Sequence, residues 1–231
     1  ITSILDKYCD IVLVGDSLAN VLYGMSNTHK ININTMLQHA LSVKKKIRRS
    51  LFIIDLPKGT YKTANIALKN SKYLIKKTGC HGVKIESNSK NYNIIKRLTK
   101  AKIPVMGHIG YTPQFKKKFK IHCMNEKNRK KLIIEAKKIE NAGAFSIVLE
   151  CISKKTAKSI TKNLKIPTIG IGSSVFCDGQ ILVTDDIIGL SGFKPKFVKK
   201  YLDVHKLINL AIKKYSKDVK ENKFPSTKNT F

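Results

Sequence analysis

The chain has 231 residues and a formal net charge of +30, with 45 Lys and Arg against 15 Asp and Glu. This length allows one large domain with a sizeable hydrophobic core, and no apolar run approaches the roughly 18 residues that cross a membrane. Only four basic residues are Arg, and the lysines are spread over nearly every predicted helix. Despite the extreme charge, the composition therefore disfavours a specific nucleic-acid-binding protein or a membrane protein.

Cysteine usage is typical of a reducing compartment. The number of cysteines is odd, and none belongs to a CxxC pair (Cys9, Cys80, Cys123, Cys151, Cys177). Such spacing favours neither a disulfide framework nor a zinc site. The chain also begins at Ile1 without the basic and apolar pattern of a signal peptide. We therefore expect a cytoplasmic protein.

Short apolar runs alternate with longer, lysine-rich helical patterns along the chain. The runs predict strands at Ile11–Val14, Leu51–Leu56, Gly82–Ile85, Ile103–Gly107, Phe145–Leu149, Ile166–Ile171 and Gln180–Val183. The patterns between them predict helices at Thr35–Lys46, Thr63–Lys77, Tyr92–Lys100, Glu126–Ala142 and Lys154–Asn163, with a final helical region from about Lys196 to Lys220. Because parallel neighbours need helical crossovers, this alternation predicts a parallel sheet.

Seven strand–helix steps are one short of the eight that close a (β/α)8 TIM barrel. We predict an α/β fold of this kind, with seven strands visible and the first strand missing upstream of Ile1. A single domain is expected over residues 1–231, with the polar tail, residues 217–231, forming a flap or fraying. An open doubly wound sheet is the alternative, but no glycine-rich dinucleotide-binding motif follows the first run.

Polar residues follow the predicted strands at the end where the active site of a parallel barrel lies. They are Asp16 and Ser17, Asp55, Lys84 and Glu86, His108 and Glu150, followed by the glycine-rich IGIGSS at Ile169–Ser174. Each alone has an ordinary structural interpretation, as a helix cap, a turn residue or a hydrogen-bonded histidine. Gly170 and Gly172 relieve crowding as readily as they admit a ligand. Polar residues of this kind recur at the ends of several predicted strands, which lie together in a barrel. This recurrence favours one shared site.

These residue types also suit one another chemically. Asp16, Asp55 and Glu86 offer hard oxygen ligands, which Mg2+ prefers, and no HExxH or cysteine cluster favours zinc. Lys84 and Glu86 are two apart on one strand, so both side chains face the barrel mouth. There the lysine can offset the charge of an anionic substrate. Glu150 ends the apolar run FSIVLE, where a carboxylate shielded from water suits a general base.

Several segments together resemble the ketopantoate hydroxymethyltransferase family. They are DIVLVGDSL at Asp10–Leu18, DLP at Asp55–Pro57, VKIE at Val83–Glu86, GHIGYTPQ at Gly107–Gln114, LEC at Leu149–Cys151, IPTIGIG at Ile166–Gly172, DGQILV at Asp178–Val183 and PKFVKKY at Pro195–Tyr201. Each is weak alone, but GDSL, GHIGYTPQ and DGQILV in this order are highly specific. The resemblance covers nearly the whole chain.

The resemblance implies a Mg2+-dependent barrel enzyme of pantothenate synthesis. It implies transfer of a hydroxymethyl group from 5,10-methylenetetrahydrofolate to 3-methyl-2-oxobutanoate, giving 2-dehydropantoate. The implied roles are metal ligation by Asp16 and Asp55, and by Glu86 through water, contact with the oxo acid by Ser17, Asp55 and Lys84, and proton removal by Glu150. From its place at a strand end, His108 is added as a supporting residue. Family members commonly form homodecamers, so we expect a homo-oligomer.

Two other functions stay open at the level of sequence. One is another Mg2+-dependent enzyme that makes or breaks C–C bonds in oxo acids, of the phosphoenolpyruvate mutase and isocitrate lyase group. That enzyme would not require methylenetetrahydrofolate. The other is an inactive, basic scaffold protein, which would bind nucleic acid with a steep salt dependence and would not bind Mg2+.

Overall fold

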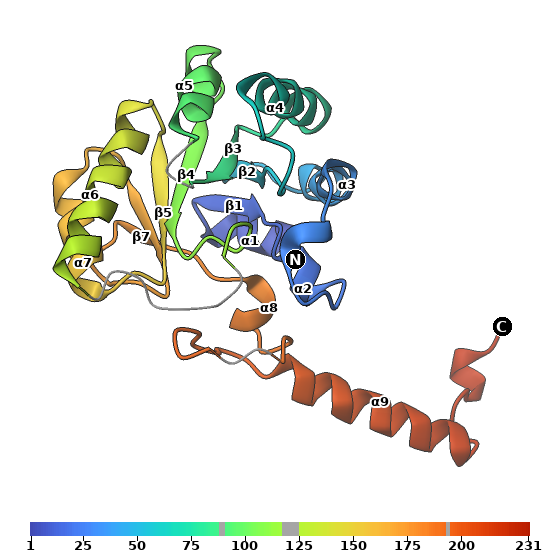
Figure 1. Cartoon of the computed structure of the whole chain (residues 1–231). Coiled ribbons are helices and arrows are strands. Elements are labelled where there is room, and N and C mark those ends of the chain that lie inside the picture. The colour runs from blue at the N-terminus through green and yellow to red at the C-terminus, as the bar shows by residue number, and fades with distance from the viewer. Residues whose placement is uncertain (88–90, 117–124, 193–194) are drawn as a thin grey trace. The chain divides into compact units, whose positions relative to one another are not determined.

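A curled sheet of parallel strands is the framework of the computed structural model (Figure 1), which describes residues 1–87, 91–116, 125–192 and 195–231. In these residues the strands are β1 (Ile11–Val14), β2 (Leu51–Asp55), β3 (Gly82–Glu86), β4 (Val105–Gly110), β5 (Ser146–Glu150), β6 (Thr168–Ile171) and β7 (Gly179–Gln180). They lie side by side in chain order, and every neighbouring pair is parallel. The predicted α/β class with seven parallel strands is confirmed.

The described chain divides into two units, Ile1–Ile181 and Leu182–Phe231. The helices of the first are α1 (Thr2–Tyr8), α2 (Leu18–Val21), α3 (Ile33–Lys44), α4 (Ala64–Thr78), α5 (Tyr92–Lys100), α6 (Glu126–Asn141) and α7 (Lys154–Asn163), with a 3-10 helix at Thr28–Lys30. The second contains α8 (Thr184–Ile187), α9 (Val204–Lys220) and a 3-10 helix at Thr227–Asn229. All predicted site residues belong to the first unit. That residues 1–231 form one domain stays a prediction.

Capping residues begin three of the crossover helices. A side-chain oxygen of Asn32, Thr63 or Asn125 accepts a hydrogen bond from the backbone N–H three residues later, at the start of α3, α4 and α6. These bonds satisfy donors that the first helical turn leaves unpaired. The bounds of α3 to α7 lie within two residues of the predicted ones. The predicted strand–helix alternation is confirmed in this region.

Two hydrophobic clusters lie on opposite faces of the sheet. The larger, between the sheet and its helices, includes Phe52, Ile54, Val83, Ile85, Val105, Ile147 and Leu149. The smaller, on the inner face, is built on Ile53, Met106, Val148 and Ile169. Side chains alternate along a strand, so Asp55, His108 and Glu150, each two positions beyond a member of the smaller cluster, also face inward. The polar site residues therefore adjoin an apolar floor.

The last strand is shorter and begins earlier than its predicted bounds. β7 covers Gly179–Gln180 instead of Gln180–Val183. Oδ2 of Asp178 accepts hydrogen bonds from the backbone N–H and the hydroxyl of Thr168, at 2.8 and 2.9 Å. These hydrogen bonds hold Asp178 beside β6, so β7 begins directly after Asp178 and ahead of most of the apolar run. The sequence pattern alone does not reveal this contact.

Helix α1 is not predicted by the sequence pattern, and a contact with distant residues holds it. The carboxylate of Asp6 accepts backbone N–H groups from Arg48, Arg49 and Ser50 at 2.9–3.2 Å. These hydrogen bonds, with that from Ser50 foremost, lower the pKa of Asp6 to about 2. Asp6 therefore ties α1 to the turn that leads into β2.

In the parts of the chain that the structure describes, no helix has the length and apolar character needed to cross a membrane. The four described cysteines, Cys9, Cys80, Cys151 and Cys177, are free thiols. The fifth, Cys123, lies outside the described residues.

Candidate active site

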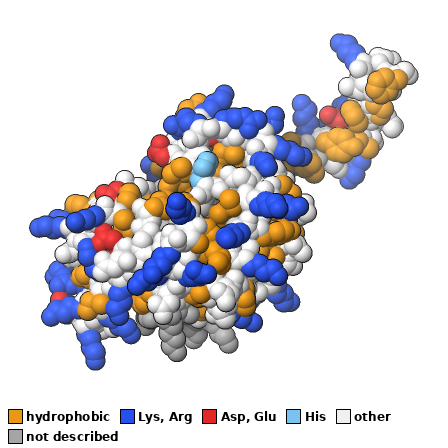
Figure 2. Space-filling model, turned by 90° about the horizontal axis from the view of Figure 1, so that it is seen from above, with side chains coloured by type: hydrophobic (Ala, Val, Ile, Leu, Met, Phe, Trp, Pro, Cys, Tyr) orange, Lys and Arg blue, Asp and Glu red, His pale blue; other side chains and the backbone are white. Residues whose placement is uncertain are grey.

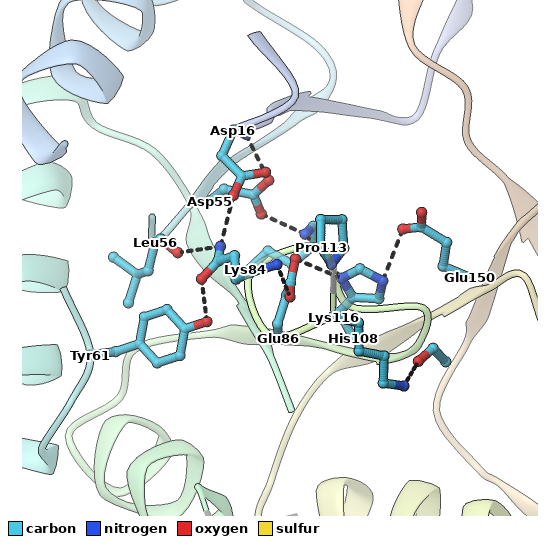
Figure 3. A network of polar contacts seen from close by, with 12 residues as sticks. Asp16, Asp55, Leu56, Tyr61, Lys84, Glu86, His108, Pro113, Lys116 and Glu150 are labelled. Atoms are coloured by element: carbon cyan, nitrogen blue, oxygen red, sulfur yellow. Dashed lines mark hydrogen bonds and ion pairs between the residues drawn. The ribbon is translucent and has the colours of Figure 1, made fainter. Parts of the chain in front are cut away.

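The carboxyl ends of neighbouring strands bring most of the predicted site residues together (Figure 3). The register pairs Asp55 with Lys84, Glu86 with His108, and Gly110 with Glu150. Asp16 follows β1, which is the neighbour of β2 in the sheet. The inward-facing ends of β1 to β5 thus form one polar region above the inner hydrophobic cluster.

Asp16 and Asp55 are a pair of adjacent, buried acidic residues. The backbone N–H of Asp16 donates a hydrogen bond to Oδ2 of Asp55 at 3.1 Å. A Cβ placed on Gly15 would lie 3.1 Å from Oγ of Ser17 and 3.4 Å from Oδ2 of Asp55. The Ser17 hydroxyl and the Asp55 carboxylate therefore approach the same space beside Gly15.

The surroundings of Asp16 disfavour the charged form of its carboxyl group. Burial and the neighbouring carboxylate of Asp55 raise the pKa of Asp16 to about 7. Lys84 and the amide of Gln114 act in the opposite direction but do not cancel this effect. The positive charge near the pair therefore only partly offsets the burial of Asp16 and its repulsion from Asp55.

Lys84 is a buried positive charge within the site. Its Nζ lies 2.7 Å from Oδ1 of Asp55 and 3.4 Å from Nδ1 of His108. Burial alone would lower the pKa of Lys84, but the surrounding carboxylates, Asp55 foremost, raise it above its usual value. The ammonium group is therefore charged at neutral pH and can face an anionic group.

Glu86 lies beside the aspartate pair. Its Oε2 accepts the backbone N–H of Gln114 at 3.0 Å, and its Oε1 lies 3.8 Å from Nδ1 of His108. Burial raises the pKa of Glu86 well above its usual value, although Lys84 opposes the shift. Across residues 1–87, 91–116, 125–192 and 195–231, no three or more His, Cys, Asp or Glu side chains are grouped so as to hold a metal ion. Glu86 therefore does not complete a three-ligand cluster with the two aspartates.

Glu150 lies on the other side of His108 from Glu86 (Figure 3). Oε2 of Glu150 is 3.0 Å from Nε2 of His108, although the approach is not along a hydrogen-bond direction. The Glu150 side chain is 15% exposed, so it is the predicted carboxylate that solvent reaches most easily. Burial and the charge of Lys84 lower the pKa of His108 well below its usual value. His108 is therefore neutral at physiological pH.

Gln114 is a site residue to which the sequence prediction gave no role. Its side-chain Nε2 donates to Oδ2 of Asp16 at 2.8 Å and to the carbonyl of Leu56 at 3.1 Å. Its Oε1 accepts a hydrogen bond from the hydroxyl of Tyr61. The signal was available, because Gln114 ends the GHIGYTPQ segment that carries the family resemblance.

Two glycines near the site have close neighbours, and at Gly110 only glycine fits. Gly110 has φ +98, and a Cβ there would lie 2.1 Å from the carbonyl oxygen of Glu150. This glycine allows β4 to turn into the segment that carries Gln114. At Gly170 a Cβ would lie 2.7 Å from Oε1 of Gln180 and 3.1 Å from Sγ of Cys177. These two atoms end side chains, so a Cβ at position 170 would displace side chains and not the backbone.

The donor set fits a divalent cation of the hard class. Mg2+ is usually bound through one or two carboxylates and keeps several ligands for water or substrate. Asp16 and Asp55 offer two such groups, and since burial and the Asp55 carboxylate both disfavour the charged form of Asp16, a cation is the kind of ligand that would stabilise that form. Asp16 and Asp55 could therefore hold Mg2+ directly.

Comparison with known proteins identifies the family. The family described as ketopantoate hydroxymethyltransferase matches residues 1–227. The chain belongs to this family. A 3-methyl-2-oxobutanoate hydroxymethyltransferase of Pelagibacter ubique is 49% identical over 231 residues, which cover 100% of this chain and 90% of that protein. One from Clostridium botulinum is 45% identical over 225 residues, 95% of this chain and 82% of that protein. The predicted membership of this transferase family is confirmed.

Solved structures give the fold neighbours of this ketopantoate hydroxymethyltransferase family member. A 2,3-dimethylmalate lyase of the PEP mutase/isocitrate lyase superfamily superposes with a TM-score of 0.59 at 12% identity, over 99% of this chain and 82% of that chain. At this identity the likeness shows the fold alone. The two share the arrangement of parallel strands and outer helices.

Proposed function

We propose that the chain is a 3-methyl-2-oxobutanoate hydroxymethyltransferase. It would transfer a one-carbon unit from 5,10-methylenetetrahydrofolate to 3-methyl-2-oxobutanoate, giving 2-dehydropantoate for pantothenate synthesis. The observation that carries the proposal is the buried pair of Asp16 and Asp55 beside Lys84, with Glu150 across His108, in a chain 49% identical to a relative of that name.

Asp16 and Asp55 would hold Mg2+ directly, and Glu86 would support the ion through water. When bound, Mg2+ supplies Lewis-acid polarisation of a keto oxygen. Lys84, charged and 2.7 Å from Asp55, would face the carboxylate of the oxo acid. The hydroxyl of Ser17, which shares the space beside Gly15 with Asp55, would be a second contact to this substrate.

Glu150 would act as the general base. Its carboxylate takes the proton from C3 of the oxo acid, and the electron pair of the broken C–H bond stays on the substrate. That pair then forms the bond to the methylene carbon of the folate, and one of the two C–N bonds of this carbon breaks towards nitrogen. The second C–N bond breaks as water supplies the hydroxyl oxygen, and the two folate nitrogens take up the proton removed by Glu150 and the proton released by water. Neutral His108, 3.0 Å from Oε2 of Glu150, would adjoin the carboxylate without pairing it with a full positive charge.

We also propose the closed (β/α)8 barrel, the homo-oligomeric assembly and the cytoplasmic location for this chain. Seven parallel strands in chain order and a dimethylmalate lyase neighbour at a TM-score of 0.59 support the barrel. Family membership supports the oligomer, which is a decamer if this chain assembles as the resemblance implies. The scarcity of Arg and the charge spread argue against a specific nucleic-acid partner.

Proton exchange tests the proposed function directly. In D2O the enzyme should replace the C3 proton of 3-methyl-2-oxobutanoate in a Mg2+-dependent reaction, measured by NMR, and product formation should require methylenetetrahydrofolate. Glu150→Gln removes the base and should slow exchange by about 10²–10⁴-fold. Glu140→Gln is the matched control, since Glu140 caps the backbone of Lys165 and Ile166 and contacts no proposed site residue. A folded wild-type protein that catalyses no exchange would refute the proposal.

A further inference from the structure

We propose that Tyr61 and Gln114 are positioning residues of the metal site: the phenol of Tyr61 fixes the amide of Gln114, and that amide orients Asp16. This inference deepens the proposed function and rests on it for the role of Asp16 as a ligand. Neither residue is assigned chemistry on the substrate.

Gln114 joins the ends of three strands. Its side-chain Nε2 reaches Oδ2 of Asp16, after β1, at 2.8 Å and the carbonyl of Leu56, after β2, at 3.1 Å. Its backbone N–H reaches Oε2 of Glu86, at the end of β3, at 3.0 Å. One buried residue therefore engages two of the three proposed metal carboxylates.

The hydroxyl of Tyr61 holds the amide in the orientation that its other two partners set. A carboxylate and a backbone carbonyl only accept hydrogen bonds, so the NH2 group of Gln114 must face Asp16 and Leu56. Oε1 then needs a donor, which the Tyr61 hydroxyl supplies. Burial and the charge of Glu86 raise the pKa of Tyr61 above its usual range, so the phenol keeps its proton. A flipped amide would place its oxygen against the carbonyl oxygen of Leu56 and would lose the hydrogen bond that Oε1 accepts from Tyr61.

This arrangement has a consequence for metal binding. Gln114 occupies Oδ2 of Asp16, so the other carboxylate oxygen is presented to the ion in a set orientation. Tyr61 is buried, and its effect reaches Asp16 through the amide. Residues that orient metal ligands typically change metal affinity by about 10–100-fold when they are mutated.

Binding of Mn2+ to the full-length protein without substrate, measured by EPR, tests the inference. Gln114→Met keeps the length of the side chain but removes the amide, and should weaken Mn2+ binding by about 10–100-fold. Tyr61→Phe removes only the hydroxyl and should weaken binding by about fivefold, the effect expected for one neutral hydrogen bond. Tyr73→Phe, in a partly buried tyrosine of α4 packed on the core, should bind Mn2+ as the wild type does.

A double variant separates positioning from a structural role. If Tyr61 acts through Gln114, adding Tyr61→Phe to Gln114→Met should cause no further loss of Mn2+ affinity. Tyr61→Phe should also raise the Mg2+ concentration for half-maximal exchange by about fivefold and leave the rate at saturating Mg2+ near the wild-type value. Full Mn2+ affinity in Tyr61→Phe, or losses that multiply in the double variant, would overturn the inference.

The two proposals fail in different ways. Wild-type protein that binds Mn2+ and loses affinity in Tyr61→Phe, but exchanges no C3 proton, overturns the proposed reaction and supports the positioning role. Wild-type protein that exchanges the proton while Tyr61→Phe binds Mn2+ unchanged overturns only the positioning role. Because Tyr61→Phe deletes a single hydroxyl, it decides the question even if Gln114→Met does not fold.

Discussion

Buried charge governs the behaviour of the individual site residues. Asp16, Asp55, Lys84 and Glu86 are all less than 7% exposed, so their charges interact with little screening by water. Burial, together with the neighbouring carboxylate of Asp55, raises the pKa of Asp16, and Lys84 only partly opposes this shift. A site of this kind is less stable empty than it would be with a cation or a neutral residue in place of one carboxylate.

Asp16→Asn should therefore stabilise the metal-free protein, and more so at about pH 8 than at about pH 4.5. The pKa of Asp16 rises from 3.8 to about 7 on folding, so stability is lost as pH rises from 3.8 towards 7 and the loss is complete above it. Urea unfolding in EDTA measures the difference. Asp10→Asn, at a fully exposed aspartate, is the control. An equal gain at both pH values would contradict the expected burial effect.

At the scale of elements, capping groups and long-range hydrogen bonds hold the helices to the sheet. Local caps at Asn32, Thr63 and Asn125 begin three crossover helices. Helix α1 depends instead on Asp6, whose carboxylate accepts backbone N–H groups of residues 48–50. Because these hydrogen bonds favour the charged form, their contribution to stability depends on pH.

Asp6→Asn should lower the urea midpoint of unfolding at about pH 7, and the deficit should shrink in acid. The pKa of Asp6 falls from 3.8 to about 2 on folding, so its stabilisation is complete above pH 3.8 and is lost as pH falls through about 2. Unfolding curves at several pH values between about 3 and 7 test this, with Asp10→Asn again as the control. A deficit that grows as pH falls would show that the charge of Asp6 is not the cause.

At the scale of the whole molecule, the net charge of +30 is the dominant property of the surface. Figure 2 shows Lys and Arg side chains scattered over the visible face, with uncharged atoms between them and few acidic groups. So many positive charges repel one another in the folded protein, and this repulsion lowers the stability of the folded state. On the face that Figure 2 shows, the basic side chains are not gathered into a single stripe.

Salt should therefore stabilise the protein. Raising NaCl from about 10 mM to about 150 mM shortens the screening length from about 30 Å to about 8 Å and weakens repulsion between surface lysines. The midpoint of thermal unfolding should rise over this range. Sucrose at equal osmolality controls for general solute effects and should raise the midpoint less. A constant or falling midpoint would contradict the expected repulsion.

Much of this architecture can be predicted from the sequence. Bounds for β1 and for α3 to α7 agree with the predictions within two residues, because apolar runs and amphipathic periods are properties of neighbouring residues. The same pattern placed Asp16, Asp55, Lys84, Glu86, His108 and Glu150 at strand ends, and motif order indicated the family. For β7 the bounds predicted from the apolar run were wrong, because the hydrogen bond between Asp178 and Thr168 places the start of the strand.

The strand-end residues and the family were thus determined by the sequence alone, whereas the contacts that position them were decided by the tertiary structure. Gln114 and Asp16 are 98 residues apart, Tyr61 and Gln114 are 53 apart, and Asp6 reaches Ser50 across 44 residues. Local periodicity carries no information about such pairs. They form only when the parallel strands take their register and bring the ends of separate crossovers into hydrogen-bond distance.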